Sequence, residues 1–299
     1  MPTQCLDLKE YLNRKSQEID HYLDQLIPER SAPYGKLFEA ARYSLLSGGK
    51  KIRPILAIAT AETLSEGKAQ IPLEVPCALE MIHTYSIIHD DLPCMDDDDF
   101  RRGKPSLHKK YDEGMAVLAG DFLLTKAFEL VAQVQELSDK KKVEIIKSIS
   151  RRSGGDGMIG GQVLDLLSTG MELDIEMLRI IHLNKTAAPI VAALECGAIL
   201  ADASEQEIEI LEIFGTQLGL AFQIIDDVLD VIGDEKTLGK PTGSDQDKNK
   251  VTYVNLMGVS QAKEAARFLQ LQALETLKQL PIDTSLLMKL STFLIDREK

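Results

Sequence analysis

The sequence has few of the features that mark disulfide-rich, zinc-binding or membrane proteins. Its 299 residues include only four cysteines, which show neither CxxC spacing nor a paired arrangement. Reduced thiols therefore fit better than a disulfide framework or a zinc site. The N-terminal residues contain no apolar signal-peptide core, and no apolar run reaches the length of a membrane span. We expect a cytoplasmic protein without integral membrane segments.

Positive charge is also scarce. The chain has 34 lysine and arginine residues against 47 aspartate and glutamate residues, so its net charge is −13. A surface of this kind repels phosphate backbones, which argues against nucleic acid as a partner. If the substrates are anionic, the site must supply cations, either as metal ions or as a local basic cluster. The 44% of hydrophobic residues is enough for a sizeable core.

Alternating strand patterns, hairpins, long polar linkers and short internal repeats are all missing from the sequence. Apolar residues instead recur with the 3.6-residue period of helices. Glycine and proline turns separate these segments. The sequence predicts an all-α protein, a single domain over residues 1–299 built as a helical bundle. The expected helices span residues 8–27, 33–46, 53–64, 72–89, 115–137, 140–152, 175–200, 204–231, 261–280 and 285–295.

The strongest chemical signal is HDDLPCMDDDDFRRG at residues 89–103. It follows an apolar helix, so its first carboxylates lie at the negative end of the helix dipole, where they need a cation. Pro93 ends the helix, so we expect Asp96 to fold back toward Asp90. Such oxygen ligands suit magnesium. The alternative is a solvated acidic loop.

A second acidic cluster, FQIIDDVLD, occupies residues 222–230. In a helix, Gln223, Asp226 and Asp230 share one face. The two aspartate charges repel each other, and the apolar neighbours screen that repulsion poorly. Alone this pattern is weak, but two aspartate-rich helices can hold a diphosphate between metal ions.

Basic residues follow glycine turns or the acidic clusters. Lys50 and Arg53 belong to GGKKIRP, Arg101 and Arg102 follow the first cluster, and Lys240 and Lys250 follow the second. Guanidinium and ammonium groups bind anionic ligands well. The alternative, that a basic residue only neutralises neighbouring acidic groups, is strong for Lys51, Lys109 and Lys110 and weaker for Lys50, Arg53 and Arg102.

Two smaller motifs contain polar groups. In GGQVLDL, Gln162 and Asp165 are one helical turn apart. The residues Asn184-Lys185-Thr186 interrupt an apolar helix, where they either cap a kink or face a polar cavity.

These motifs, in this order over almost the whole chain, resemble the trans-isoprenyl diphosphate synthase family, closest to its bacterial and plastid-type farnesyl and geranylgeranyl members. The resemblance implies a homodimeric helical bundle around a deep cavity, with Mg²⁺ as cofactor. It implies that isopentenyl diphosphate joins head to tail with an allylic diphosphate and that pyrophosphate is released. The best single expectation is a farnesyl product.

The resemblance also implies roles for individual residues. The expected metal ligands are Asp90, Asp91, Asp96, Asp226, Asp227 and Asp230. Arg101, Lys185 and Lys240 would bind the allylic diphosphate, and Lys50, Arg53, His83 and Arg102 the isopentenyl diphosphate. The allylic cation would form beside Lys185, Thr186 and Gln223. Lys250 would join the site on closure, although Asn249 stands before it where the family often has glycine.

The fifth residue before Asp90 is Tyr85, and an aromatic residue there resembles farnesyl-type members. The alternative is that Tyr85 is ordinary core. A geranylgeranyl or geranyl diphosphate synthase is the main alternative function. A terpene cyclase is less favoured, because Lys50, Arg53 and Arg102 indicate a second diphosphate subsite. Two intact aspartate clusters argue against a non-catalytic prenyl-diphosphate-binding subunit.

Overall fold

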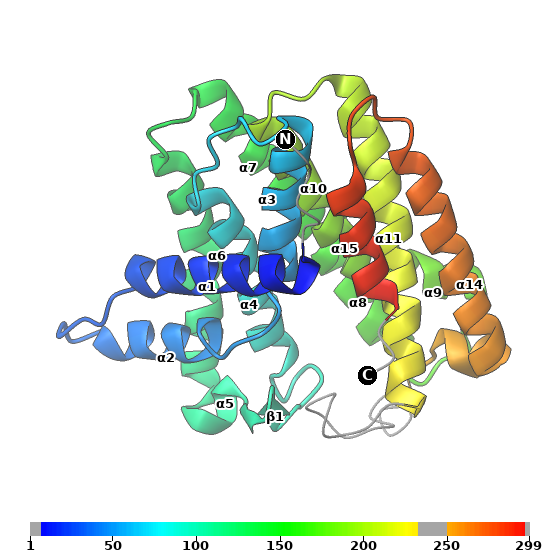
Figure 1. The fold of residues 1–299 in the computed structure, drawn as a ribbon. Helices are drawn as coiled ribbons and strands as arrows, with labels where there is room; N and C mark the ends of the chain where they lie inside the picture. Colours follow the sequence, from blue (N-terminus) through cyan, green and yellow to red (C-terminus); the bar gives the residue numbers. More distant parts are fainter. Residues whose placement is uncertain (1–6, 233–249, 297–299) are drawn as a thin grey trace. The chain divides into compact units, whose positions relative to one another are not determined.

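The computed structural model describes residues 7–232 and 250–296 (Figure 1). Helices account for most of these residues, so the predicted all-α class is confirmed. Contacts divide the chain into two compact units. Unit 1 is Met1–Ile58 with Ile71–Val143, and unit 2 is Ala59–Gln70 with Glu144–Lys299. The single domain over residues 1–299 stays a prediction, and each unit is described by itself.

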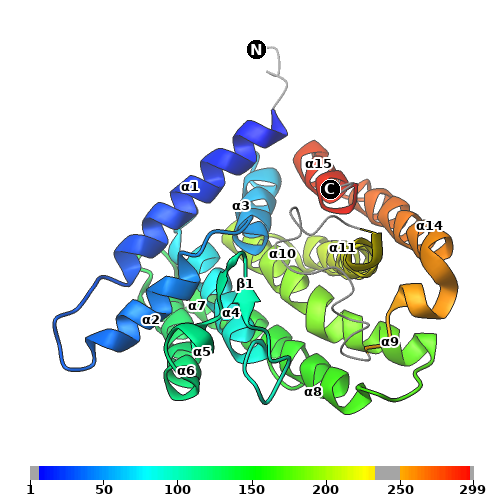
Figure 2. The same cartoon turned by 90° about the horizontal axis from the view of Figure 1, so that it is seen from below.

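Unit 1 is organised around helix α4, which packs along α6, and α2 also packs against α6 (Figure 2). Helix α4 is buried along most of its length, since about two thirds of its residues up to Ile88 are apolar. Its C-terminal end carries the first aspartate cluster. The elements of unit 1 are α1 (Leu8–Leu26), α2 (Gly35–Leu45), the first part of α3 (Ile52–Leu64), α4 (Glu74–Asp90), β1 (Phe100–Arg101), β2 (Lys104–Pro105), α5 (Leu107–Lys110) and α6 (Glu113–Gln133).

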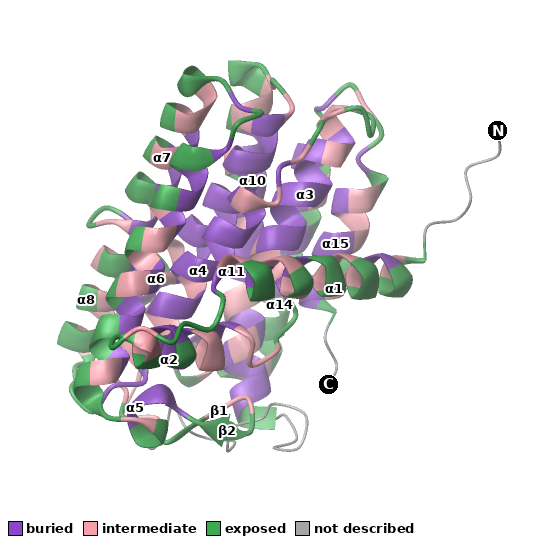
Figure 3. Ribbon diagram, turned by 90° about the vertical axis from the view of Figure 1, so that its left-hand side faces the viewer, coloured by how far each residue is buried: buried purple, intermediate pink, exposed green. Residues whose placement is uncertain are grey.

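Unit 2 is organised around α11, which packs along α14 and against α10. Helix α10 is buried almost throughout (Figure 3). The second aspartate cluster lies near the C-terminal end of α11. The elements are α7 (Asp139–Ser153, which begins in unit 1), α8 (Met158–Ser168), α9 (Ile175–His182), the π-helix η1 (Leu183–Ala187), α10 (Ala188–Leu200), α11 (Glu205–Ile232), α14 (Tyr253–Leu277) and α15 (Ser285–Ile295).

Capping residues explain several helix starts. Asp112 accepts the N–H of Met115 at the start of α6, and Asp174 accepts that of Met177 at the start of α9. These contacts satisfy N–H groups that have no partner within the helix. Thr252 and Asn255 form a capping box, so α14 begins at Tyr253 rather than near residue 261 as predicted.

The structure corrects the sequence prediction at three places. Helices α5 and α8 were not predicted, because α5 is a single turn and α8 begins in a glycine-rich stretch. No hairpin was predicted either, yet β1 and β2 pair antiparallel. Arg102 and Gly103 connect these strands with φ values of 53° and 73°. Two positive φ values are typical of a two-residue hairpin turn.

Two helical stretches are long and apolar enough to cross a membrane, which corrects the expectation that none reaches that length. They are Ile175–Leu200 and Glu205–Ile232, and their most apolar windows are 78% and 50% buried within the structure. Buried core helices meet the same criterion. The predicted absence of integral membrane association stays a prediction.

Candidate functional site

The first aspartate cluster forms a turn at the end of α4. The helix ends at Asp90, and the N–H of Asp96 donates to the carbonyl oxygen of Asp90 at 2.9 Å. The expected return of Asp96 toward Asp90 is therefore present. It brings the backbones of two predicted magnesium ligands together at the negative end of a buried helix.

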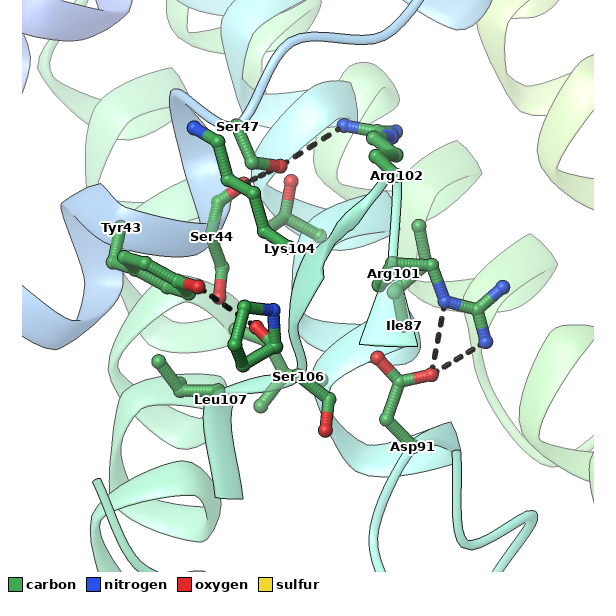
Figure 4. Close-up of a pocket in the computed structure, with 13 residues that line it drawn as sticks. Tyr43, Ser44, Ser47, Ile87, Asp91, Arg101, Arg102, Lys104, Ser106 and Leu107 are labelled. Carbon is green, nitrogen blue, oxygen red and sulfur yellow. Dashed lines mark hydrogen bonds and ion pairs between the residues drawn. The ribbon is translucent and has the colours of Figure 1, made fainter. Parts of the chain in front are cut away.

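Asp91 lies beside this turn and is 3% exposed. The Arg101 side chain donates to Oδ1 of Asp91 at 3.0 Å from Nε and 2.5 Å from Nη2 (Figure 4). Nη2 of Arg101 also donates to Oδ2 of Asp98 at 2.7 Å. Burial raises the pKa of Asp91 to about 6, with Asp98 and Asp90 adding to the rise and Arg101 opposing it. Arg101 therefore already holds two carboxylates together, a contact that the sequence did not predict.

Arg102 lies against the glycine turn of GGKKIRP. Its Nη1 donates to the carbonyl oxygen of Gly48 and lies 3.5 Å from Oγ of Ser47 (Figure 4). Gly49 has a φ of 108°, which favours glycine, and a Cβ atom there would lie 2.6 Å from the flexible guanidinium end of Arg102. The structure thus brings together two basic motifs that are about 50 residues apart in sequence.

His83 belongs to the same basic group. Burial lowers its pKa well below the ordinary value, and Arg53 and Arg102 lower it further. The imidazole is therefore neutral, and it can donate one hydrogen bond to an anion without carrying charge. Lys50 is exposed at the turn.

Lys51 has a different role from Lys50. It is buried, and its Nζ lies 3.1 Å from Glu80 and 3.3 Å from Asp20, and donates to the Leu45 carbonyl oxygen at 3.0 Å. These contacts confirm the alternative that Lys51 neutralises acidic side chains. Its contacts hold the turn that carries Lys50.

The second aspartate cluster lies in unit 2 on α11. Asp227 is 2% exposed and accepts the Gln223 amide on Oδ1 and the Tyr253 N–H on Oδ2, each at 3.0 Å. Asp227 thereby joins α11 to the start of α14. Asp230 is also buried, whereas Asp226 is partly exposed. The metal-binding roles of the three aspartates stay predictions.

The Asn184-Lys185-Thr186 interruption is a π-helical turn, η1. Such turns often occur at functional sites because they re-orient side chains within a helix. Lys185 Nζ donates to Oδ2 of Asp165 at 2.7 Å, and Lys250 Nζ lies 3.5 Å from the same oxygen. A Cβ on Gly161 would lie 2.3 Å from the Lys185 backbone nitrogen, so glycine permits this close approach of α8.

Asp165 belongs to the GGQVLDL motif, but it was not predicted to be a site residue. Burial alone would raise its pKa, but Lys185 and Lys250 outweigh burial and lower it. A carboxylate that is ionised and shared by two lysines fixes both ammonium groups. The GGQVLDL motif was the feature of the sequence that could have identified Asp165.

Thr186 and Gln223 are also brought together. The Thr186 hydroxyl donates to Oε1 of Gln223 at 2.7 Å, and the Gln223 amide nitrogen donates to Asp227. The amide orientation is therefore fixed from both sides. Lys240 lies outside the described residues.

Tyr85 lies in α4, is 5% exposed, and contacts His89 edge-to-face with the ring centres 5.8 Å apart. Burial raises its pKa to about 12. Its hydroxyl is buried, with no hydrogen-bond partner in the described part of the chain. An unsatisfied buried hydroxyl is unfavourable in ordinary core.

The chemistry of the first cluster fits magnesium. Its ligating atoms would be carboxylate oxygens, which Mg²⁺ prefers. Burial is the main cause of the raised pKa of Asp91, and the charges of Asp98 and Asp90 add repulsion to it. A bound cation would relieve that repulsion. Asp90 and Asp96 are the residues that would hold it in unit 1.

Comparisons with known proteins identify the family. The model of the family described as Polyprenyl synthetase matches residues 35–283. The chain therefore belongs to the polyprenyl synthetase family, whose chemistry is the head-to-tail condensation of isoprenyl diphosphates.

Relatives with different products are similarly close. The chain is 42% identical to a farnesyl diphosphate synthase of Geobacillus stearothermophilus, over 88% of this chain and 89% of that protein. It is 43% identical to a chloroplastic heterodimeric geranylgeranyl pyrophosphate synthase large subunit 1 of Arabidopsis thaliana, over 91% of this chain and 74% of that protein.

Solved structures show the same fold. An apo FPP/GFPP synthase of Zymomonas mobilis matches with a TM-score of 0.86 at 34% identity, covering 97% of this chain and 99% of that one. A geranyltransferase of Helicobacter pylori, complexed with magnesium and isoprenyl diphosphate, matches with a TM-score of 0.84 at 34% identity and 98% coverage of both chains.

Proposed function

We propose that this protein is a magnesium-dependent farnesyl diphosphate synthase. It would condense isopentenyl diphosphate with dimethylallyl and then geranyl diphosphate, releasing pyrophosphate at each step. The observation that carries the proposal is the Asp90–Asp96 turn beside Arg101 and Arg102, in a chain of the polyprenyl synthetase family. Carboxylates for a metal and guanidinium groups for a diphosphate are the two requirements of this chemistry.

The basic group of unit 1 supports binding of isopentenyl diphosphate. Arg53 and Arg102 both lower the pKa of His83, so their charges act at one place. A diphosphate placed there would receive hydrogen bonds from these residues and from Lys50. The uncharged imidazole adds a donor without adding to the repulsion among the cations.

The polar group of unit 2 supports binding of the allylic substrate and protection of the cation formed from it. Lys185 is held by Asp165, and Thr186 holds the Gln223 amide oxygen. A fixed carbonyl dipole stabilises positive charge without reorganising during the reaction. Bound magnesium would supply charge that stabilises the departing diphosphate. The proton lost from the new carbon chain would pass to that diphosphate.

Tyr85 supports a fifteen-carbon product. Its bulky ring lies on α4, one and a half turns before Asp90. Geranylgeranyl diphosphate synthase is the second candidate, because chloroplastic relatives with that name are as similar as the farnesyl relative.

The decisive experiment is incubation with dimethylallyl diphosphate, labelled isopentenyl diphosphate and Mg²⁺, followed by dephosphorylation and chromatography. We expect farnesol as the main product. Geranylgeraniol would establish the second candidate. Pyrophosphate release that does not require isopentenyl diphosphate would indicate a cyclase instead, and no turnover would contradict the enzyme assignment.

We also propose that the protein is a cytoplasmic homodimer, as the family resemblance implies. Light scattering coupled to gel filtration measures the mass in solution, and the mass of a single chain would contradict the homodimer. Cell fractionation tests the cytoplasmic location.

A further inference from the structure

A second group of potential metal ligands lies just after the predicted magnesium ligands of unit 1. One atom each from Asp97, Asp99 and His108 lie within 4.8 Å of one another. The two aspartates are exposed, whereas His108 is 7% exposed. None of the three residues belongs to the proposed catalytic site.

The imidazole of His108 has one nitrogen without a hydrogen-bond partner. Its Nε2 is buried and lacks a partner among the described residues. The nearest carboxylate oxygen, Oδ1 of Asp97, is 3.9 Å away, too far for a hydrogen bond. Buried polar nitrogens are nearly always partnered, so this one indicates a ligand that the described residues do not supply.

The contacts of the other imidazole nitrogen, Nδ1, bear on which ring nitrogen of His108 carries the lone pair. The Ser106 hydroxyl donates to the backbone carbonyl of Asp99 at 3.3 Å, and Oγ of Ser106 lies 3.2 Å from Nδ1 of His108. With the hydroxyl proton directed to that carbonyl, Nδ1–H is placed to donate to Oγ. In that tautomer the lone pair is on Nε2, which lies 3.9 Å from Oδ1 of Asp97. A histidine that ligates a metal is oriented in the same way, by a hydrogen bond from its other nitrogen.

We propose that Asp97, Asp99 and His108 bind one divalent transition-metal ion, for which Zn²⁺ is the probe. A nitrogen ligand favours such an ion over magnesium, which prefers an all-oxygen set. Three protein ligands and a water would complete a four-coordinate zinc site.

The present spacing requires a small movement of the exposed aspartates. Ligands about 2.0–2.1 Å from zinc lie roughly 3.3 Å apart in a tetrahedron. Lys109, whose Nζ lies 2.8 Å from Oδ1 of Asp99, competes for that carboxylate. The bound ion would tie the loop after α4 to helix α5.

The test is calorimetric titration of the full-length protein with Zn²⁺ in millimolar Mg²⁺, so that the predicted magnesium sites are filled. We expect one Zn²⁺ per chain. His108→Gln and Asp99→Asn should each weaken binding by about 100-fold or more, beyond what loss of a residue supporting a ligand causes. His21→Gln, which removes an exposed histidine, should bind as the wild type does.

Melting curves separate metal binding from misfolding. Without zinc, Asp99→Asn should melt like the wild type, because Asp99 is exposed. Added Zn²⁺ should raise the melting temperature of the wild type but not of this variant. Unchanged zinc affinity in both His108→Gln and Asp99→Asn would overturn the proposal. Loss of zinc binding only in Asp90→Asn would also overturn it, by placing zinc at the predicted magnesium site.

Discussion

The hydroxyl of Thr186, on the π-helix η1, donates a hydrogen bond of 2.7 Å to Oε1 of Gln223 on α11. Because the Gln223 amide nitrogen donates to Asp227, the carbonyl oxygen is fixed toward Thr186. A residue outside regular α-helical geometry therefore positions a side chain of the aspartate-rich helix.

The first prediction concerns this contact. Thr186→Val keeps the side-chain shape and removes the hydroxyl, so the Gln223 amide loses one of its two partners. We expect turnover to fall by about 10–100-fold and the free energy of unfolding to fall by about 1 kcal/mol. Thr186→Ser restores the hydroxyl and should recover most of the activity. Turnover that is equal in the valine and serine variants would contradict a role for the hydroxyl.

The second prediction is metal dependence. Removal of Mg²⁺ with a chelator should abolish turnover, and adding excess Mg²⁺ should restore it. Asp90→Ala and Asp226→Ala should each reduce turnover by roughly 10³-fold or more, since a charge that stabilises the leaving diphosphate is lost. Asp139→Asn changes an exposed carboxylate and serves as the control. Near-normal activity in Asp226→Ala would remove the second cluster from the mechanism.

The positions of the strongly periodic helices could be predicted from the sequence, because apolar residues at helical spacing mark an amphipathic helix. The return of Asp96 toward Asp90 was also predictable, because proline ends a helix. Helix α8 was missed because it begins at Met158 and includes Gly160 and Gly161, and glycine lowers helix propensity. Close contact with η1 compensates for that cost.

The roles of individual aspartates were harder to predict. Neighbouring aspartates on one helix look equivalent in sequence, yet Asp227 is buried and bonded to the start of α14 while Asp226 is partly exposed. Which one faces inward depends on the packing of α14 along α11, a contact between segments distant in sequence. The pairing of Asp165 with Lys185 and Lys250 depends on tertiary contacts in the same way.

The third prediction separates the two diphosphate subsites. Arg53→Ala should raise the KM for isopentenyl diphosphate more than the KM for the allylic substrate, and Lys240→Ala should do the reverse. Loss of one hydrogen bond to a charged group costs about 1.5–3 kcal/mol, which is a change of more than tenfold in KM. Steady-state kinetics with each substrate varied in turn measures both values. Equal effects of both substitutions on both substrates would contradict the division.

The fourth prediction concerns pH and His182. Burial lowers the pKa of His182 to about 4, with Asp165 opposing and Lys185 adding to the shift. The unfolded chain, with a pKa near 6.5, binds a proton that the folded chain does not. The stability that comes from keeping His182 neutral is therefore fully present above about pH 6.5 and is lost as the pH falls toward 4.

Urea unfolding at pH 7 and pH 5 measures this effect. His182 should account for about 2 kcal/mol of the stability that the wild type loses between these pH values. His182→Phe keeps a ring against Tyr253, 5.4 Å away, and should lose correspondingly less. The exposed variant His21→Gln should behave like the wild type. A pH dependence in His182→Phe equal to that of the wild type would assign the loss to other groups.

The last prediction concerns Tyr85 and product length. If the ring ends the space available to a fifteen-carbon chain, Tyr85→Ala should extend that space toward Met81 and Ile82, and geranylgeranyl or longer diphosphates should appear on chromatography. If Tyr85 is ordinary core, the product should stay the same and the free energy of unfolding should fall by about 3–5 kcal/mol.

Tyr85→Phe is the matched variant, because it keeps the ring and removes only the hydroxyl. That hydroxyl is buried without a hydrogen-bond partner in the described part of the chain, so its removal from dry core should stabilise the protein. If ring volume rather than polarity limits the chain, the phenylalanine variant should still make the fifteen-carbon product. A longer product from Tyr85→Ala, with the fifteen-carbon product retained in Tyr85→Phe, supports the chain-length role. An unchanged product in Tyr85→Ala with a large drop in melting temperature assigns Tyr85 to the core.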